Sequence, residues 1–172
     1  SRFRKKFSLI RVLGKGGFGI VFEAENNLDK QKYAVKRIPF YGTNINIENA
    51  SKEVKILASF NHPGIVRYNC SWIETPQEGW EGTARIGITY RGNCTFLFIQ
   101  MELGQSTLED WLKDNNVREP SKIRSWFKQI VSAVGYIHKQ NKIHRDLKPS
   151  NILIFCDDVV KICDLGIATA FE

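Results

Sequence analysis

The sequence has 172 residues, a formal net charge of +7 and 42% hydrophobic residues, which suffices for one domain with a sizeable core. It contains no apolar run long enough to span a membrane and no signal-peptide pattern. Its four cysteines lack C-x-x-C spacing, so we expect neither a zinc site nor a disulfide framework, and a reducing compartment is favoured. The positive net charge would suit a phosphate-rich ligand or an acidic partner. It would equally fit a basic surface that binds neither. Because the chain begins without Met, we expect a segment of a longer protein.

A glycine-rich stretch lies near the start, between two predicted strands. Residues 7–13 predict the first strand, and Gly14-Lys15-Gly16-Gly17-Phe18-Gly19-Ile20-Val21 follows. The pattern G-x-G-x-x-G opens a helix in dinucleotide-binding folds, but here residues 20–24 predict a second strand. A strand, a glycine turn and a strand favour a phosphate-binding loop, because glycine lets backbone N–H groups approach a phosphate.

A lysine and a glutamate further on have no obvious place in a core. Residues 33–38 predict a strand with Ala34, Lys36 and Ile38 on one face, followed by a loop over 39–46. Residues 47–60 predict a helix with Glu53 beside its apolar stripe. Lys36 could face solvent on an edge strand, and Glu53 could reach water. An ion pair between them is favoured because it explains both residues at once.

The middle of the chain alternates turns and apolar runs. It predicts a turn over 61–64 that includes His62, a strand over 65–74 and an irregular insert over 75–93. Residues 95–103 are almost continuously apolar, which predicts a strand buried on both faces. The following junction, Glu102 to Gly104, would suit an adenine held by backbone groups, or is a simple strand-to-helix connection.

Two helices are predicted next. Ser106 to Glu109 has the capping-box pattern of a short helix that continues through Lys113. Ser121 is predicted to cap the longest helix, which continues to about Gln140. We expect its apolar stripe to pack in a core, and this stripe consists of Ile123, Trp126, Phe127, Ile130, Val131, Val134, Ile137 and His138.

The long helix is followed by Ile143-His144-Arg145-Asp146-Leu147-Lys148-Pro149-Ser150-Asn151. Asp146, Lys148 and Asn151 provide a carboxylate, an ammonium group and an amide. Phosphoryl transfer needs such groups to orient a hydroxyl, stabilise the moving phosphoryl and help hold magnesium. Strands are predicted over 152–155 and 159–162, and Asp164-Leu165-Gly166 follows the second, where a carboxylate suits magnesium that bridges phosphates. Taken alone, each of these motifs would also fit an ordinary polar loop.

These signals occur in the order found in eukaryotic protein kinases, and the sequence resembles the amino-terminal two-thirds of such a domain, of the serine/threonine type. Within that group, Gly16 to Gly19, residues 61–68, Trp72 to Glu74 and Ile99 to Glu102 resemble the kinases of the translation initiation factor 2 alpha subunit. This family includes the endoplasmic-reticulum stress, amino-acid-starvation and double-stranded-RNA-activated kinases.

The resemblance implies an α+β, two-lobed kinase-like fold and one incomplete kinase domain over 1–172. Residues 1–103 would form a β-rich small lobe, and residues 104–172 the first part of a helical large lobe. It also implies ATP and Mg²⁺ as cofactors. Asp146 is the implied catalytic base, Lys148 stabilises the moving phosphoryl, and Asn151 and Asp164 bind the metal.

The resemblance further implies that Lys36, paired with Glu53, holds the phosphates. The other implied nucleotide-binding residues are Leu13, Gly14, Lys15, Gly16, Gly17, Phe18, Gly19, Ile20, Val21, Ala34, Met101, Glu102 and Leu103.

The implied function is ATP-dependent phosphorylation of serine or threonine, with the alpha subunit of translation initiation factor 2 as substrate, in a stress response that lowers translation. The alternative is a truncated or regulatory kinase-like module that binds ATP or a partner without phosphotransfer. We expect a kinase-domain dimer through the small lobe and no direct contact with nucleic acid. We also expect a cytoplasmic location, whether or not a longer protein carries a membrane anchor.

Two features depart from the family pattern. Leu165 stands where these kinases usually have Phe, and it is apolar enough to fill the same place. The sequence ends at Glu172, before an A-P-E motif. We therefore expect the 172-residue piece alone to be inactive and poorly stable, with Trp126 and Phe127 exposed.

Overall fold

The computed structural model describes residues 1–16, 19–41, 54–75, 94–165 and 169–170. These residues belong to two compact units. The first unit consists of residues 1–51 and 68–103, and the second of residues 52–67 and 104–172. The first unit therefore lacks residues 52–67 of the predicted small lobe, and the division of the chain into lobes stays a prediction.

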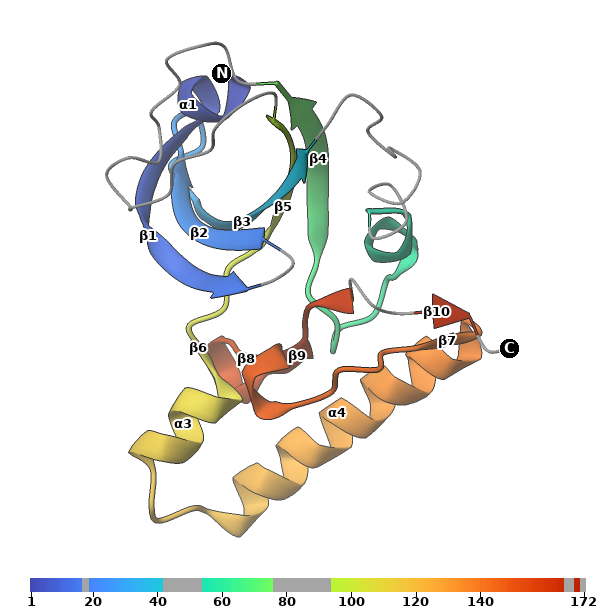
Figure 1. The fold of residues 1–172 in the computed structure, drawn as a ribbon. Helices are drawn as coiled ribbons and strands as arrows, with labels where there is room; N and C mark the ends of the chain where they lie inside the picture. The colour runs from blue at the N-terminus through green and yellow to red at the C-terminus, as the bar shows by residue number, and fades with distance from the viewer. Residues whose placement is uncertain (17–18, 42–53, 76–93, 166–168, 171–172) are drawn as a thin grey trace. The chain divides into compact units, whose positions relative to one another are not determined.

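The first unit is built on a five-stranded sheet with the strand order β1-β2-β3-β5-β4, and all neighbouring pairs are antiparallel. The strand β3 lies between β2 and β5, so it is not an edge strand (Figure 1). The strand bounds are β1 (Phe7–Gly16), β2 (Gly19–Asn26), β3 (Lys32–Tyr41), β4 (Tyr68–Glu74) and β5 (Cys94–Glu102). Residues 95–100 of β5 are all buried, which confirms the strand predicted from its continuous apolar run.

The first two strands are longer than the predicted 7–13 and 20–24, since β1 continues to Gly16 and β2 spans Gly19–Asn26. Two other boundaries differ because the pairing partners are distant in the sequence. β3 continues to Tyr41 through the predicted loop, since Pro39 pairs with Phe96 and Tyr41 with Cys94. β4 begins at Tyr68 rather than at Ile65. Ile65 instead forms a bridge with Ile162, and Val66 N–H donates to the Ile162 carbonyl at 3.0 Å within the second unit.

A short helix that the sequence did not predict, α1 (Arg2–Lys6), precedes β1. Its Phe3 is buried and stacks on Phe7 and Phe98, with ring centroids 5.6 and 5.2 Å apart. The Glu74 carboxylate accepts from Phe3 N–H at 2.6 Å and from Trp72 Nε1 at 2.7 Å. These contacts to β4 and β5 hold a helix that is too short to be stable by itself.

The second unit contains α3 (Leu108–Asp114), α4 (Pro120–Lys139) and two small sheets. One sheet has the order β6-β8-β9 and the other pairs β10 with β7. Their strands are β6 (Ser106–Thr107), β7 (Lys142–Ile143), β8 (Ile152–Ile154), β9 (Val160–Ile162) and β10 (Thr169–Ala170). Residues 54–59 are helical, whereas residues 47–53 of that predicted helix lie outside the described residues, as does the insert over 76–93.

Both predicted helix caps were wrong by one or two residues. Thr107, not Ser106, caps α3 by accepting from Asp110 N–H at 3.0 Å. Glu119, not Ser121, precedes α4, whose first residue is Pro120. Proline is favoured there since the first helical N–H has no intrahelical partner.

The predicted core stripe of α4 is divided between a buried and an exposed face. Trp126 is 2% exposed, which contradicts its predicted exposure: its indole N–H donates to the Asp158 carbonyl at 3.0 Å and its ring packs edge-on against Trp111. Phe127 is 65% exposed, as predicted. Ile123, Val131 and His138 are also exposed, which corrects their placement in the core. Val131 and His138 each lie about 100° around the helix from the preceding residue, and so they miss the packed face.

His62 lies in the segment predicted as a turn, where its Nδ1 accepts from Gly64 N–H at 3.0 Å and its ring lies against Tyr136. Cys70, Cys156 and Cys163 are free thiols. Within the described part of the chain, no helix is long and apolar enough to cross a membrane.

Candidate active site

The sheet of the first unit places several predicted nucleotide-binding residues in neighbouring rows. Val21 is the register partner of both Gly14 and Lys36, and Ala34 is the partner of Met101. Residues directly opposite on adjacent strands share a face, as do residues two apart on one strand. Val21, Ala34, Lys36 and Met101 therefore lie on one face of the sheet.

Lys36 is only 6% exposed on the interior strand β3. This excludes the alternative of a solvent-facing lysine on an edge strand. A buried ammonium group needs compensating interactions. The predicted partner, Glu53, lies outside the described residues, so the pairing of these two residues stays a prediction.

The glycines at the β1–β2 hairpin differ in what the fold requires of them. Gly19 has a φ of +119°, and a Cβ there would lie 2.2 Å from the Arg37 carbonyl oxygen. A Cβ at Gly14 or Gly16 would have no heavy atom within 4 Å. Packing thus explains Gly19 but not Gly14 or Gly16, and these two leave backbone open to a ligand. Gly17 and Phe18 lie outside the described residues.

The predicted adenine-binding segment follows directly from β5. Met101 and Glu102 are the last residues of β5, and Leu103 follows them. All three residues are half-buried. Leu13, Lys15 and Ile20 belong to the hairpin, where Lys15 pairs with Ile20. The structure thus places all described members of the predicted nucleotide-binding set on four strands of the first unit, β1, β2, β3 and β5, or immediately after β5.

In the second unit, three predicted residues of the catalytic loop form one hydrogen-bonded group. Lys148 Nζ lies 2.8 Å from Asp146 Oδ2, and Asn151 Nδ2 donates to the same oxygen at 2.9 Å. Asn151 Nδ2 also donates to the Asp146 backbone carbonyl at 2.8 Å. The segment Pro149–Asn151 forms a 3₁₀ turn that begins after Lys148, which has the extended backbone expected before proline.

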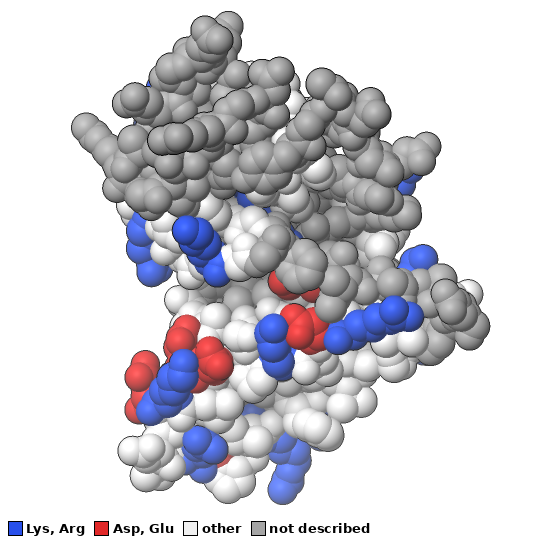
Figure 2. All heavy atoms as spheres, in the orientation of Figure 1, with Lys and Arg blue, Asp and Glu red and all other residues white. Residues whose placement is uncertain are grey.

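The charges of this group reinforce one another. The Lys148 ammonium lowers the pKa of the Asp146 carboxyl below its ordinary value of 3.8; partial burial opposes this, and the Asn151 amide adds to it. In turn, the hydrogen bond from Lys148 to Asp146 raises the pKa of Lys148 above 10.5. Both groups are therefore charged near neutral pH. Figure 2 shows acidic and basic side chains next to one another on the face of the second unit that it draws.

His144 connects the catalytic loop to the segment that carries Asp164. Its ring is buried, and its Nδ1 accepts from Asp146 N–H at 3.2 Å. Nδ1 is therefore the ring nitrogen without a proton, and the ring proton lies on Nε2. This Nε2 donates to the Cys163 carbonyl at 2.9 Å. Sequence reasoning gave His144 no role, because the partner is a backbone carbonyl that follows a hairpin.

Asp164 is held beside Asn151 through the backbone. Cys163 N–H donates to the Asn151 carbonyl at 2.9 Å, and Asp164 has a φ of 58°. Leu165, which follows, is completely buried, so the leucine at the usual Phe position fills an apolar site. The structure thus brings together Asp146, Lys148, Asn151 and Asp164 within one unit.

These side chains fit a magnesium ion bound through phosphates. Both side-chain hydrogen bonds from Asn151 to Asp146 use its Nδ2, which leaves Oδ1 as a ligand, and Asp164 supplies a carboxylate. Within the described ranges, no group of three or more His, Cys, Asp or Glu side chains could hold a metal. Mg²⁺ commonly uses one or two protein oxygens and completes its shell with phosphates and water.

The chain matches the family model of the protein kinase domain over residues 7–172. It is 41% identical over 174 residues to the interferon-induced, double-stranded RNA-activated protein kinase of Rattus norvegicus, covering 99% of this chain and 33% of that protein. It is 32% identical to the eIF-2-alpha kinase GCN2 of Arabidopsis thaliana, covering 98% of this chain and 15% of that protein. It is 48% identical over 81 residues to the eukaryotic translation initiation factor 2-alpha kinase 3 of Rattus norvegicus, covering 47% of this chain and 7% of that protein.

The β-rich first unit and the partly helical second unit confirm the predicted α+β fold of protein kinase type. The chain belongs to the protein kinase domain family, and the predicted resemblance to the initiation factor 2 alpha kinases is confirmed. Protein kinases in general use ATP and Mg²⁺. The chain spans a third or less of the length of these three curated relatives.

Proposed function

We propose that this chain is the nucleotide-binding and catalytic-loop part of a serine/threonine protein kinase. The observation that carries the proposal is the Asp146 carboxylate, fixed by Lys148 at 2.8 Å and by Asn151 at 2.9 Å. A carboxylate with two donors is oriented, and it stays ionised near neutral pH. Both properties suit a group that positions a hydroxyl and accepts its proton.

When bound, ATP supplies the phosphoryl group and Mg²⁺ neutralises its charge. In the reaction that we propose, the substrate hydroxyl oxygen forms a bond to the terminal phosphorus as the bond to the leaving ADP breaks. Asp146 accepts the hydroxyl proton, and Lys148 stabilises the negative charge on the moving group. Asn151 and Asp164 hold the metal through oxygen atoms.

Nucleotide binding is assigned to the first unit. Lys36 binds phosphate oxygens through its ammonium group, with Glu53 as its proposed partner. The backbone of the glycine-rich stretch covers the phosphates, which is supported by the open surroundings of Gly14 and Gly16. Ala34 and the segment from Met101 to Leu103 contact the adenine. The remaining proposed contacts come from Leu13, Lys15, Gly17, Phe18, Gly19, Ile20 and Val21.

For the substrate, we propose the alpha subunit of translation initiation factor 2, phosphorylated in a stress response that lowers translation. Support comes from two relatives that are named as kinases of that factor. A dimer through the small lobe and the absence of nucleic-acid contact both stay predictions. The cytoplasmic location also stays a prediction, since it rests on the resemblance and on the thiols.

The test uses the longer protein that contains this chain, in phosphate transfer from labelled ATP to the alpha subunit. The variants are Asp146→Asn and, as a matched control, Asp157→Asn at an exposed turn outside the site. We expect Asp146→Asn to lose about 10²–10⁴-fold in turnover while ATP binding is retained, and Asp157→Asn to be unchanged. ATP binding without transfer by the unaltered protein would instead support the non-catalytic module.

A further inference from the structure

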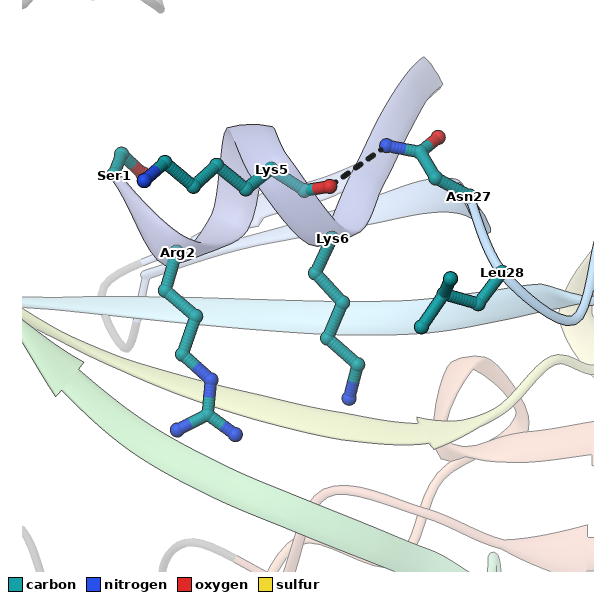
Figure 3. Close-up of a pocket in the computed structure, with 6 residues that line it drawn as sticks. All are labelled: Ser1, Arg2, Lys5, Lys6, Asn27 and Leu28. Atoms are coloured by element: carbon teal, nitrogen blue, oxygen red, sulfur yellow. Dashed lines mark hydrogen bonds between the residues drawn. The ribbon is translucent and has the colours of Figure 1, made fainter.

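The surface beside α1 contains a hollow that the kinase reaction does not use. It has a volume of about 460 Å³, is open to solvent and lies within the first unit. Figure 3 shows its lining, in which Arg2 and Lys6 extend from the same side of α1. The residues that line it are Ser1, Arg2, Lys5, Lys6, Asn27 and Leu28.

The hollow is basic, because three of its six lining residues are cations and none is acidic. Arg2 lies over the Trp72 ring at 5.1 Å, and Lys6 lies over the same ring at 5.8 Å. Within the described residues, neither Arg2 nor Lys5 forms an ion pair with a carboxylate. Lys6 donates to Gln100 Oε1 at 3.1 Å and to Cys70 Sγ at 3.8 Å, which leaves one of the three N–H groups of its ammonium for a ligand.

The walls of the hollow are fixed in place. The turn after β2 is tied to the end of α1, since Asn27 N–H donates to the Lys6 carbonyl at 2.8 Å. Asn27 Nδ2 also donates to the Lys5 carbonyl at 3.1 Å (Figure 3). Phe3 anchors the helix in the aromatic core of the first unit. A ligand would therefore meet cations whose positions are set before it binds, which reduces the entropy lost on binding.

The rim of the hollow adds an apolar contact. Leu28 is 89% exposed at the turn between β2 and β3, and it lies near Lys6 in Figure 3. A single exposed leucine is ordinary on a protein surface. Next to an open basic hollow, however, it provides a contact that a small inorganic anion could not use.

We propose that this hollow binds an acidic peptide segment of a partner protein, with carboxylates on Arg2 and Lys6 and an apolar side chain on Leu28. Arg2 and Lys6 are one helical turn apart, so their Cβ atoms lie about 6 Å from each other. Carboxylates two residues apart on an extended segment are separated by about 7 Å, which matches this spacing. A compact phosphate would instead need its donors to converge on one point.

The experiment measures fluorescence anisotropy of a labelled peptide of alternating glutamate and leucine, added to the longer protein that contains this chain. A peptide with glutamine in place of glutamate serves as the uncharged control. The protein variants are Arg2→Gln with Lys5→Glu, and Leu28→Ser. The matched control is Lys128→Glu, which changes charge on the exposed part of α4, outside the hollow. Thermal melting checks that each variant is folded.

We expect the glutamate peptide to bind and the glutamine peptide not to bind. Binding should weaken about tenfold or more in the Arg2→Gln, Lys5→Glu variant and should be unchanged in Lys128→Glu. Leu28→Ser should weaken it severalfold. Equal weakening by Lys128→Glu would overturn the proposal, because binding would then follow net charge alone.

Three further outcomes would overturn the proposal by naming another occupant. Inorganic phosphate that displaces the peptide at equal ionic strength would make the hollow a simple anion site. An RNA oligonucleotide that binds more tightly and loses affinity in the same variants would make it a nucleic-acid site. Self-association that is abolished by the Arg2→Gln, Lys5→Glu variant would identify a second copy of the chain as the occupant.

Discussion

Asn151 is joined twice to Asp146: one amide nitrogen donates both to the carboxylate, at 2.9 Å, and to the backbone carbonyl, at 2.8 Å. Asn151 is buried, whereas Asp146 and Lys148 are more exposed. The buried Asn151 amide therefore holds both the backbone and the side chain of Asp146, the proposed base. Lys148 approaches the same carboxylate from the exposed side, with its Nζ 2.8 Å from Asp146 Oδ2.

Replacing Asn151 by alanine should therefore impair the chemistry more than the fold. We expect Asn151→Ala to lower turnover about 10²-fold or more, because Asp146 would lose its orientation. Stability should fall by about 1–3 kcal/mol, because the Asp146 carbonyl would lose its donor. Phosphate transfer and thermal melting of the same preparation measure the two effects.

Asn115→Ala is the matched control, since Asn115 Nδ2 also donates to a backbone carbonyl, that of Trp111, at 2.8 Å. It should lower stability and leave turnover unchanged. If the two variants lost activity to the same extent, Asn151 would have only a structural role.

The glycines of the β1–β2 hairpin give a second prediction. Gly16→Ala should change stability by less than about 0.5 kcal/mol, because no heavy atom lies within 4 Å of the new Cβ. It should nevertheless weaken nucleotide binding about tenfold, if the backbone approaches the phosphates there. Gly19→Ala should instead destabilise the protein by more than about 2 kcal/mol, because its Cβ would lie 2.2 Å from the Arg37 carbonyl oxygen. Calorimetry with an ATP analogue measures the affinity, and melting curves measure the stability. If Gly16→Ala bound the nucleotide as tightly as the unaltered protein, the proposed contact between this backbone and the phosphates would be wrong.

The contact between the 61–65 segment and α4 gives a third prediction. A Cβ at Gly64 would lie 2.9 Å from Ala133 Cβ and 3.3 Å from the Gln129 carbonyl oxygen. Both belong to a rigid helix, so we expect Gly64→Ala to cost about 1–3 kcal/mol. The same change at Gly135, within α4, would meet no atom within 4 Å and should be stabilising by about 0.5–1 kcal/mol. Chemical denaturation measures both, and a neutral Gly64→Ala would mean that this segment moves away from α4 easily.

The sequence predicted well those elements whose signal is contained in their own residues. The apolar run of β5 fixed its position to within one residue at each end, and the catalytic loop brought Asp146, Lys148 and Asn151 together because they are adjacent in sequence. Lys36 could be placed on a strand face, but only the neighbours β2 and β5 show that the strand is interior.

The predictions that were wrong depend on partners distant in the sequence. Pro39 belongs to β3 because it pairs with Phe96. Ile65 does not belong to β4, because it forms a bridge with Ile162 instead. Five residues of α1 carry too little periodicity for a prediction, and Trp72 and Glu74 supply its contacts. The bond between His144 and the Cys163 carbonyl likewise follows from the hairpin that returns Cys163 to the loop.

The last prediction concerns Glu23, which is buried on β2 and accepts from Arg11 Nε at 2.7 Å, with Lys32 Nζ at 3.3 Å. Burial alone would raise the pKa of this carboxyl, but the two cations together lower it below its ordinary value of 4.5. Because the folded-state pKa is the lower one, the stabilisation is complete above about pH 4.5 and is lost as the pH falls through the folded-state value.

We therefore expect Glu23→Gln to destabilise the protein by about 1 kcal/mol at pH 7, a modest value since Arg11 and Lys32 are largely exposed. The difference from the unaltered protein should shrink as the pH falls below 4.5. Glu25→Gln is the control, because Glu25 lies on the same strand and has no ion pair within the described residues. Melting temperatures from pH 7 to pH 3 test this. A Glu23→Gln deficit that stays constant over that range would mean that the carboxylate stabilises β2 by packing and not by its charge.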